Sequence, residues 1–122
     1  MDRPTVAGLA GVVLFADRAD TLAHWYEQYL GLFFSREPDS HQWWCQLPGG
    51  ISFAIHQSRH PLGHERRHCE ITWEVADLDA FVEYLADQGL PVDERQEASG
   101  GDFAWLDDPE GNRIELYQRR EG

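Results

Sequence analysis

The stretch that decides the fold lies near the end of the chain, where residues 102–118 read DFAWLDDPEGNRIELYQ. A run with alternating apolar residues precedes a turn at 108–112, which contains proline, glycine and asparagine. Such a segment reverses direction without strain, because proline presets φ and glycine and asparagine tolerate positive φ. After the turn, Ile114 and Leu116 share one face and Glu115 points to the other. The stretch therefore predicts a β-hairpin with a carboxylate on the face opposite its apolar residues.

The length and composition predict one globular domain. The chain has 122 residues, of which 42% are hydrophobic and five are tryptophan, and this suffices for a core. No apolar run approaches the about 20 residues that cross a bilayer, and the first residues show no signal-peptide pattern. We therefore expect a soluble, cytoplasmic protein with no membrane partner. Cys45 and Cys69 are too few for a disulfide scaffold, and we expect both to be buried free thiols.

The charge is strongly negative and unevenly distributed. The formal net charge is −12, with six acidic and four basic residues in positions 1–61 and sixteen and six in positions 62–122. Such a field repels phosphate backbones, so we expect no nucleic-acid partner. All ten basic residues are arginine, and this excludes a lysine Schiff base and a P-loop lysine. A cationic ligand suits this charge, although an acidic surface that keeps the chain soluble is the simpler explanation.

The predicted strands and helices follow the same order twice. The first half predicts strands over 8–16, 32–36, 42–47 and 51–57, with a helix from Asp20 or Thr21 to about 30. The second half predicts a strand over 69–76, a helix from Asp77 or Asp79 to about 88, a short strand over 91–94, a polar loop over 96–101 and the hairpin. We therefore expect two modules in one domain of residues 1–122, at about 6–57 and about 69–118, with a linker over 58–68.

This weak internal repeat predicts an α+β fold of two tandem βαβββ modules. The segment FAIHQ at 53–57 matches IELYQ at 114–118, and both halves share a strand–Asp–helix–Gly layout. One amphipathic helix for each set of alternating strands implies a sheet covered on one side and open on the other. Two such sheets that face each other would enclose a cleft.

The double βαβββ layout, the ending FAWLDDPEGNRIELYQ and the segment EVADLDAFVEYLADQGL resemble the vicinal oxygen chelate superfamily. This superfamily includes glyoxalase I, bleomycin-resistance proteins, extradiol dioxygenases, fosfomycin-resistance enzymes and methylmalonyl-CoA epimerase. The resemblance covers about residues 8–118 and implies a glyoxalase/bleomycin-resistance-like fold with a cleft between curved sheets, in a homodimer. The same scaffold carries metal-dependent enzymes and metal-free binding proteins, so the fold alone does not choose between these functions.

The resemblance also implies four positions for metal ligands, which fall here at Gly11, Ala54, Glu70 and Glu115. The first two have no side chain that can ligate, so two carboxylates remain without the imidazoles that a transition-metal site usually needs. A register shift of two residues would bring in His56 or His68. We therefore expect no complete metal site and no cofactor, and if a divalent metal binds, Glu115 and Glu70 would hold it.

The candidate ligand contacts combine carboxylates, histidines and aromatic rings: Glu70, Glu115, His56, His68, Trp43, Trp44, Trp105, Tyr117 and Arg113. Trp43 and Trp44 are adjacent on a strand, so they point to opposite faces, and parity does not say which faces the cleft. A tryptophan beside carboxylates suits a flat or cationic ligand through stacking and cation–π attraction. Glu70 and Glu115 have two further interpretations, as a pair that shares a proton and as partners of an arginine.

Three functions remain open at this point. The leading one is a small-molecule binding protein of the bleomycin-resistance type, with a cationic or aromatic ligand and no complete metal site. The alternative is a metal-dependent lyase, isomerase or dioxygenase of the glyoxalase type that uses Glu115, Glu70 and a histidine, His56 or His68. The third is a metal-free enzyme with the two glutamates, Glu70 and Glu115, as acid and base. The sequence does not name the ligand or say whether the modules pair within or between chains.

Overall fold

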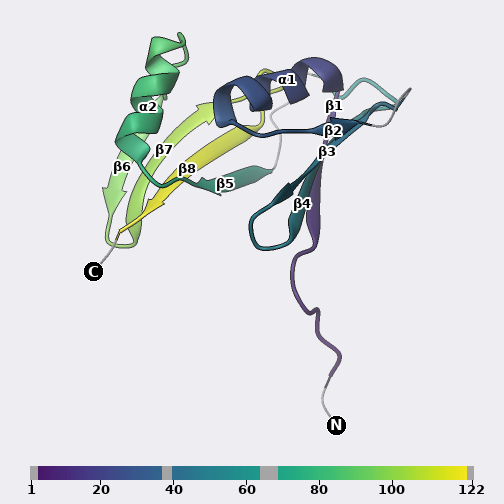
Figure 1. Cartoon of the computed structure of the whole chain (residues 1–122), viewed down its shortest axis with the longest axis horizontal. Helices are drawn as coiled ribbons and strands as arrows, with labels where there is room; N and C mark the ends of the chain where they lie inside the picture. The colour runs from purple at the N-terminus through teal and green to yellow at the C-terminus, as the bar shows by residue number, and fades with distance from the viewer. Residues whose placement is uncertain (1–2, 37–39, 64–68, 121–122) are drawn as a thin grey trace. The chain divides into compact units, whose positions relative to one another are not determined.

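The computed structural model describes residues 3–36, 40–63 and 69–120 of the chain, and two βαβββ modules follow one another along it (Figure 1). The first module contains β1 (Gly11–Ala16), α1 (Ala19–Leu30), β2 (Ser35–Arg36), β3 (Gln42–Leu47) and β4 (Ile51–Gln57). The second contains β5 (Glu70–Glu74), α2 (Leu78–Asp87), β6 (Glu94–Ala98), β7 (Gly101–Asp107) and β8 (Arg113–Arg119). The chain divides into two compact units, unit 1 (Met1–Leu62) and unit 2 (Gly63–Gly122). The predicted α+β fold of two tandem modules is confirmed.

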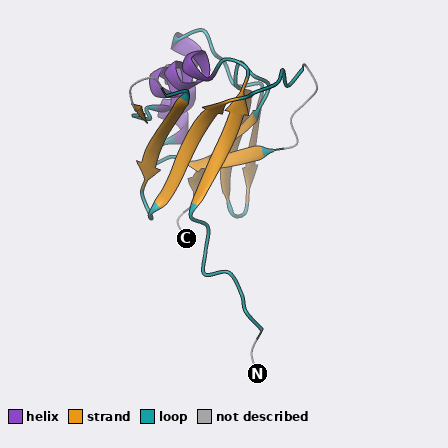
Figure 2. Ribbon diagram, turned by 90° about the vertical axis from the view of Figure 1, so that its right-hand side faces the viewer, coloured by secondary structure: helices purple, strands orange, loops and turns teal. Residues whose placement is uncertain are grey.

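Each unit contains one four-stranded sheet, and the two sheets have the same topology (Figure 2). In unit 1 the strand order is β1-β4-β3-β2 (sheet A), and in unit 2 it is β5-β8-β7-β6 (sheet B). The first strand pairs in parallel with the last one, and the remaining neighbours are antiparallel. Helix α1 contacts β1, β3 and β4, and α2 contacts β7 and β8. The predicted cleft between the sheets stays a prediction.

The core of each unit lies between its helix and its sheet. In unit 1, Tyr26 of α1 packs against Phe53 of β4, with ring centroids 5.6 Å apart, and both side chains are buried. In unit 2, Leu85 of α2 and the predicted apolar pair of β8, Ile114 and Leu116, are buried. Burial of each such side chain stabilises the fold by about 1.5–3 kcal/mol. Among the described residues, no helix is long and apolar enough to span a membrane.

A glutamine at the end of the last strand holds the first turn of the helix in each unit. In unit 1 the Oε1 atom of Gln57 accepts a hydrogen bond from the backbone N–H of Ala19 at 3.1 Å. In unit 2 the Oε1 atom of Gln118 accepts one from the backbone N–H of Leu78 at 2.7 Å. The first N–H groups of a helix have no partner within the helix, so each glutamine satisfies a group that the helix leaves open. The match between FAIHQ and IELYQ therefore has a structural cause.

The predicted helix starts are wrong for α1 and right for α2. Helix α1 begins at Ala19, earlier than predicted, and its N-cap residue Arg18 makes no side-chain capping bond. Gln57 replaces that cap from a distant part of the sequence. At α2, the Oδ1 atom of Asp77 accepts a hydrogen bond from the backbone N–H of Ala80 at 3.0 Å, as a capping aspartate does.

Several predicted strand boundaries are also wrong. Strand β6 covers residues 94–98, so the strand predicted over 91–94 begins later, and most of the loop predicted over 96–101 is strand. The cause is pairing, because β7 supplies backbone partners to a polar segment whose own sequence shows no apolar alternation. Strand β2 forms only at residues 35–36, and β1 begins at residue 11. Part of the predicted linker, residues 64–68, lies outside the described residues.

The turn between β7 and β8 forms where the sequence predicts it. The Oδ1 atom of Asp108 accepts hydrogen bonds from the backbone N–H groups of Glu110 and Asn112, each at 2.9 Å. Its Oδ2 atom accepts a third bond at 2.8 Å from the amide side chain of Asn112. Gly111 adopts a φ of 85°, which few other residues tolerate. Local side-chain bonds therefore hold the reversal, and they fix the register in which β8 returns along β7.

Arg113 at the start of β8 joins the strands of the second hairpin. Both oxygens of Asp93 accept hydrogen bonds from its guanidinium at 2.7 Å, and Asp107 accepts a third at 3.2 Å. Glu94 lies 3.6 Å from the same group. The hydrogen bond from Arg113 lowers the pKa of Asp93, and the same bond raises the pKa of the guanidinium. The main role of Arg113 is therefore to link β8 to β7 and to the start of β6.

The change Gln118→Met tests the glutamine link in unit 2. This change keeps the length of the side chain but removes the oxygen that accepts the hydrogen bond of the Leu78 backbone N–H. We therefore expect the free energy of unfolding to fall by about 1–2 kcal/mol. Urea denaturation of both proteins measures this difference. Gln96→Met, at an exposed position of β6, is the matched control and should change stability by less than about 0.5 kcal/mol. Equal effects of the two changes would show that the link carries no stability.

The change Asp93→Asn tests the ion pair with Arg113 through its pH dependence. Because the folded-state pKa of Asp93 is lowered, its contribution is present above the unfolded value of about 3.9 and is lost as pH falls through the folded value. Asp93 is half exposed, so we expect a loss of only about 1 kcal/mol at neutral pH, and a smaller one below about pH 4. Urea denaturation across this pH range checks it, with Asp87→Asn on α2 as control. A difference that stays constant with pH would contradict the assignment.

Candidate functional site

The open face of sheet B is the candidate site. It is the face opposite to the buried side chains of Ile114 and Leu116, and alternation along the strands assigns its residues. They include Glu70, Thr72 and Glu74 of β5, Glu94 and Gln96 of β6, Phe103, Trp105 and Asp107 of β7, and Arg113, Glu115, Tyr117 and Arg119 of β8. The strand register places Thr72 opposite Glu115 on one side, and Trp105 opposite Glu115 on the other. Glu115 is therefore the centre of a row of three side chains.

Both oxygens of the Glu115 carboxylate accept hydrogen bonds from neighbouring strands. The hydroxyl group of Thr72 donates to Oε1 at 2.7 Å, and the indole N–H of Trp105 donates to Oε2 at 3.0 Å. These two donors fix the orientation of the carboxylate. An ionised carboxylate has about four lone-pair sites, so each oxygen keeps capacity for a further donor. Glu115 is half-buried, and a ligand group can approach an acceptor that is already oriented.

Three aromatic rings lie in a row beside this carboxylate. Phe103 stacks on Tyr117 with ring centroids 5.2 Å apart, and on Trp105 with centroids 5.9 Å apart. The hydroxyl group of Tyr117 donates to the backbone carbonyl of Gly100 at 3.2 Å. A Cβ atom at Gly101 would collide with the ring of Tyr117, so glycine there allows the ring to lie close to the strand. The three rings therefore form an aromatic surface beside Glu115, and their mutual contacts hold it in place.

Glu70 and Arg113 occupy the end of the same face. Glu70 is exposed and lies opposite Arg113 in the register of β5 and β8. The residue of β5 that donates a hydrogen bond to Glu115 is Thr72, and Glu70 lies two residues before Thr72 on this strand. The guanidinium of Arg113 is already bonded to aspartates, so its positive charge is largely compensated. The face thus keeps a negative balance despite this arginine.

The open face of sheet A carries different side chains at the matching positions. Trp44 lies opposite Ala54, and Trp43 points to the other side of the strand. There the guanidinium of Arg36 lies over the ring of Trp43, 4.9 Å from its centroid. The ring of His56 contacts Phe15 edge-on, with centroids 5.9 Å apart. The tryptophan on the open face is therefore Trp44. The other predicted histidine, His68, lies outside the described residues.

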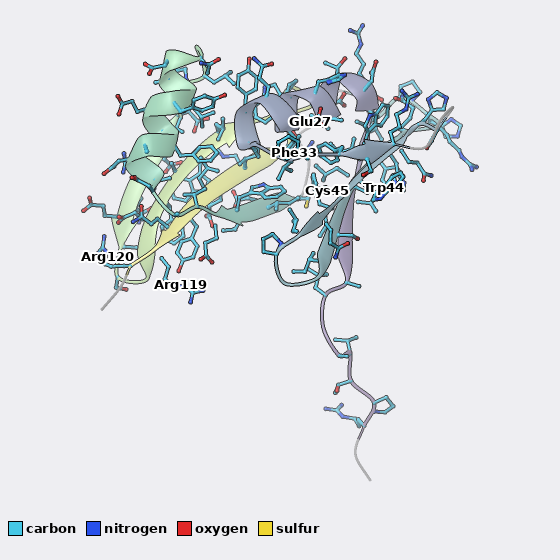
Figure 3. The ribbon with its side chains drawn as sticks, in the orientation of Figure 1. Glu27, Phe33, Trp44, Cys45, Arg119 and Arg120 are labelled. Carbon is cyan, nitrogen blue, oxygen red and sulfur yellow. The ribbon has the colours of Figure 1, made fainter. Side chains whose placement is uncertain are left out.

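The two cysteines differ in their surroundings. Cys45 is the neighbour of Trp44 on β3 and points to the opposite side of the strand (Figure 3). It is buried, and burial raises the pKa of its thiol, as expected for an inert cysteine. Cys69 is exposed and precedes the first residue of β5, so the prediction that both thiols are buried is wrong for it.

The metal-ligand positions that the resemblance implies do not fit a transition metal in the described residues. Gly11 has no room for a side chain, because a Cβ atom there would collide with the hydroxyl oxygen of Ser52. Ala54 is buried and has no donor atom. Within residues 3–36, 40–63 and 69–120, no group of three histidine, cysteine, aspartate or glutamate side chains is placed to hold an ion. The two remaining carboxylates, Glu70 and Glu115, supply too few ligands on their own.

Two residues of this face escaped the sequence analysis. Thr72 and Phe103 complete the contacts of Glu115 and Tyr117, and the sequence analysis did not choose either as a site residue. A signal was present for Thr72, since parallel pairing of the first and last strands of a module places the middle of EITWE beside the middle of IELYQ. For Phe103, the signal is the antiparallel register of the β7–β8 hairpin, which places Phe103 opposite Tyr117.

Comparisons with known proteins agree with this fold. The model of the glyoxalase-like domain family matches residues 11–117. No protein of curated function matches the sequence significantly. Three solved structures are similar in fold. The first is a putative glyoxalase family protein from Bacillus anthracis, with 20% identity and a TM-score of 0.79 over 98% of this chain and 100% of that one.

The second is a lactoylglutathione lyase from Agrobacterium tumefaciens, with 16% identity and a TM-score of 0.75 over 93% of this chain and 95% of that one. The third is the fosfomycin resistance protein FosX from Mesorhizobium loti, with 18% identity and a TM-score of 0.70 over 95% of each chain. Identities this low establish the fold and leave the activity open. Because the family model covers most of the sequence, the chain belongs to the glyoxalase-like domain family of the vicinal oxygen chelate superfamily.

Proposed function

We propose that unit 2 binds a small organic molecule on the open face of sheet B, and that the ligand combines a flat aromatic ring with a cationic hydrogen-bond donor. The observation that carries this proposal is the geometry of Glu115. Its two oxygens are oriented by Thr72 and Trp105 and retain acceptor capacity. An acceptor that is fixed before binding loses little conformational freedom when a ligand donates to it.

The aromatic row supports the choice of a flat ligand. The ring of Trp105 donates to the Glu115 carboxylate, and the rings of Phe103 and Tyr117 continue the same aromatic row. All three side chains are half-buried, so each keeps part of its surface available. Aromatic pairs contribute about 0.5–1.5 kcal/mol beyond the area that they bury. A ring that stacks here would direct its substituent toward the carboxylate.

The charges around Glu115 support the choice of a cation. Glu70, Glu74 and Glu115 lie on this face, and the guanidinium of Arg113 is compensated by Asp93 and other carboxylates. The remaining arginine at this end of β8, Arg119, lies 3.5 Å from Glu74, and Figure 3 shows it at the end of the strand. An anionic ligand would meet net repulsion, whereas a cation would be attracted.

Binding accounts for the contacts of Glu115 more directly than acid–base catalysis does. Both of its oxygens accept hydrogen bonds from neutral donors, Thr72 and Trp105, which hold the carboxylate in one orientation. A shared proton would need a second carboxylate in contact, and the neighbour that bonds to Glu115 from β5 is a threonine. These features support a binding protein over a metal-free enzyme that uses Glu70 and Glu115 as acid and base.

A matched ligand series tests the proposal. Benzamidine, benzamide and benzoate have the same ring and carry a cationic, a neutral and an anionic group. We expect tryptophan fluorescence titrations to show the tightest binding for benzamidine and the weakest for benzoate. Glu115→Gln should weaken benzamidine binding by about tenfold or more, because a hydrogen bond to a charged group contributes about 1.5–3 kcal/mol.

The control for this titration is Glu97→Gln, which removes the same charge from the opposite face of sheet B. Glu97 lies opposite Asp102 in the register of β6 and β7, one position out of phase with the face of Trp105. We expect this change to alter the affinity for benzamidine by less than about twofold, since exposed charges further away are largely screened by salt. Binding of benzoate as tight as benzamidine, or equal losses for the two variants, would contradict the proposal.

Metal analysis tests the alternative of a metal-dependent lyase, isomerase or dioxygenase. Elemental analysis of the purified protein is combined with a thermal-shift screen against Fe²⁺, Mn²⁺, Ni²⁺, Zn²⁺ and Mg²⁺. A metal that binds the native state would add about 2.7 kcal/mol of stability at 100 times its Kd. On the donor set of the described residues we expect no such shift. A stoichiometric metal that is lost in Glu115→Ala would overturn our proposal and favour an enzyme.

A further inference from the structure

A second carboxylate lies near Glu115 on the same face of sheet B. Thr72 is opposite Glu115 in the register of β5 and β8, and Glu74 is two residues further along β5. Glu74 and Glu115 are therefore diagonal neighbours on adjacent parallel strands. With a strand spacing of about 4.8 Å and a rise of about 3.3 Å per residue, their Cα atoms are about 8 Å apart. Both carboxylates are therefore within reach of one small ligand.

Tyr117 lies at the corner between these two carboxylates. It is opposite Glu74 and two residues after Glu115 on β8. Its ring stacks on Phe103, and its hydroxyl group donates to the backbone carbonyl of Gly100, so two contacts hold the side chain. A flat ligand beside this ring would have one carboxylate along the strand and the other across it. The arrangement therefore suits an aromatic ligand with a cationic group at each end.

The arginine that contacts Glu74 is loosely held. The Nη2 atom of Arg119 lies 3.5 Å from Oε1 of Glu74, and the two side chains are 70% and 59% exposed. A well-formed hydrogen bond between charged groups is about 2.7–2.9 Å long, and an exposed ion pair contributes little to stability. Arg113, by contrast, is 18% exposed and donates to both oxygens of Asp93 at 2.7 Å. Arg119 is therefore the arginine of this face that a ligand can displace at little cost.

The next residue, Arg120, carries the same charge on the opposite side of the chain. Alternation along β8 places Arg119 on the face of Glu115 and directs Arg120 to the other face. Arg120 donates a hydrogen bond to Asp102 there. Figure 3 shows the two labelled arginines on opposite sides of the end of β8. Arg119 and Arg120 therefore form a matched pair, in which Arg119 is the one that contacts Glu74.

We propose that the ligand is a linear aromatic dication, which bonds to Glu115 through one cationic group and to Glu74 through the other, and that Arg119 is a tethered competitor for Glu74. When this ligand binds, its second cationic group replaces the guanidinium of Arg119, which turns toward solvent. This inference rests on the proposed function, since it names the ligand class of the same site. It adds Glu74 and Arg119 as the residues that select for the second charge of the ligand.

A matched pair of ligands tests for the second cation. Benzene-1,4-dicarboxamidine and 4-carbamoylbenzamidine have the same shape, but the second group is a cation in the first and neutral in the second. Tryptophan fluorescence titrations give the ratio of their two dissociation constants. We expect the dication to bind at least about fivefold more tightly, which exceeds the factor of about two that its two equivalent ends supply. Glu74→Gln should lower this ratio by at least about threefold, because it removes the charge that the second cation meets.

The change Arg119→Gln gives a sharper test, because removal of a competitor makes binding tighter. We expect this variant to raise the ratio by at least about threefold, through tighter binding of the dication. In the Glu74→Gln background the same change should leave the ratio unaltered, since the two residues act through one contact. A residue with a merely structural role would not strengthen the binding of one ligand of the pair.

The matched control is Arg120→Gln, which removes the same charge from the opposite face and breaks the contact with Asp102. We expect it to change the ratio by less than about 1.5-fold, since salt screens exposed charges that are further away. An equal increase of the ratio in Arg119→Gln and Arg120→Gln would reflect the net charge of the protein alone. That result would overturn the proposed competition for Glu74.

The outcomes separate this inference from the proposed function. If the wild-type protein bound neither ligand, the ligand site itself would be contradicted, and this inference with it. If both ligands bound and Glu115→Gln weakened both, but the ratio stayed near two in the wild type and in Arg119→Gln, the dication alone would be overturned. A ratio that Glu74→Gln leaves unchanged would also overturn it while the proposed function stands.

Discussion

Each unit shares one constraint: a glutamine at the end of its last strand accepts a hydrogen bond from the backbone N–H at the start of its helix. Gln57 and Gln118 stand at the same place in their modules, and each holds the helix that follows the first strand. Because the helix is held there, it covers one defined face of its sheet. Side-chain alternation then assigns every strand residue to the covered or the open face. The bond therefore helps to fix the helix over the face whose apolar side chains form the core, and the other face stays open.

On the three strands β1, β4 and β3 and their counterparts β5, β8 and β7, the two open faces carry different side chains at matching positions. The central position on the last strand is Glu115 in unit 2 and Ala54 in unit 1, and each has a tryptophan opposite it on the neighbouring antiparallel strand. The threonine that donates to Glu115 corresponds to Val13 in unit 1. The same strand register thus supports a polar contact in one unit and an apolar row in the other.

The sequence predicted the fold well because the repeat and the alternation of apolar residues are local signals. The start of α1 was not predicted, since its capping partner Gln57 is 38 residues away from Ala19. The position of β6 was not predicted either, because a polar edge strand is defined by pairing with β7 and not by its own pattern. For the site, Glu115, Trp105 and Tyr117 were chosen from side-chain alternation and the family resemblance, whereas Phe103 was missed. The donor Thr72 was missed because it depends on the register between β5 and β8.

The uneven charge of the chain gives the two units different chemical roles. A carboxylate at the centre of an acidic, aromatic face suits a small cation, since the surrounding charges raise its local concentration before it reaches Glu115. The same charges would oppose the approach of a second acidic chain. Residues 3–16 of unit 1, by contrast, contain one arginine and no acidic residue. Sixteen acidic residues lie in positions 62–122 and six in positions 1–61, so the attraction for the proposed cationic ligand comes mainly from unit 2, where the candidate site lies.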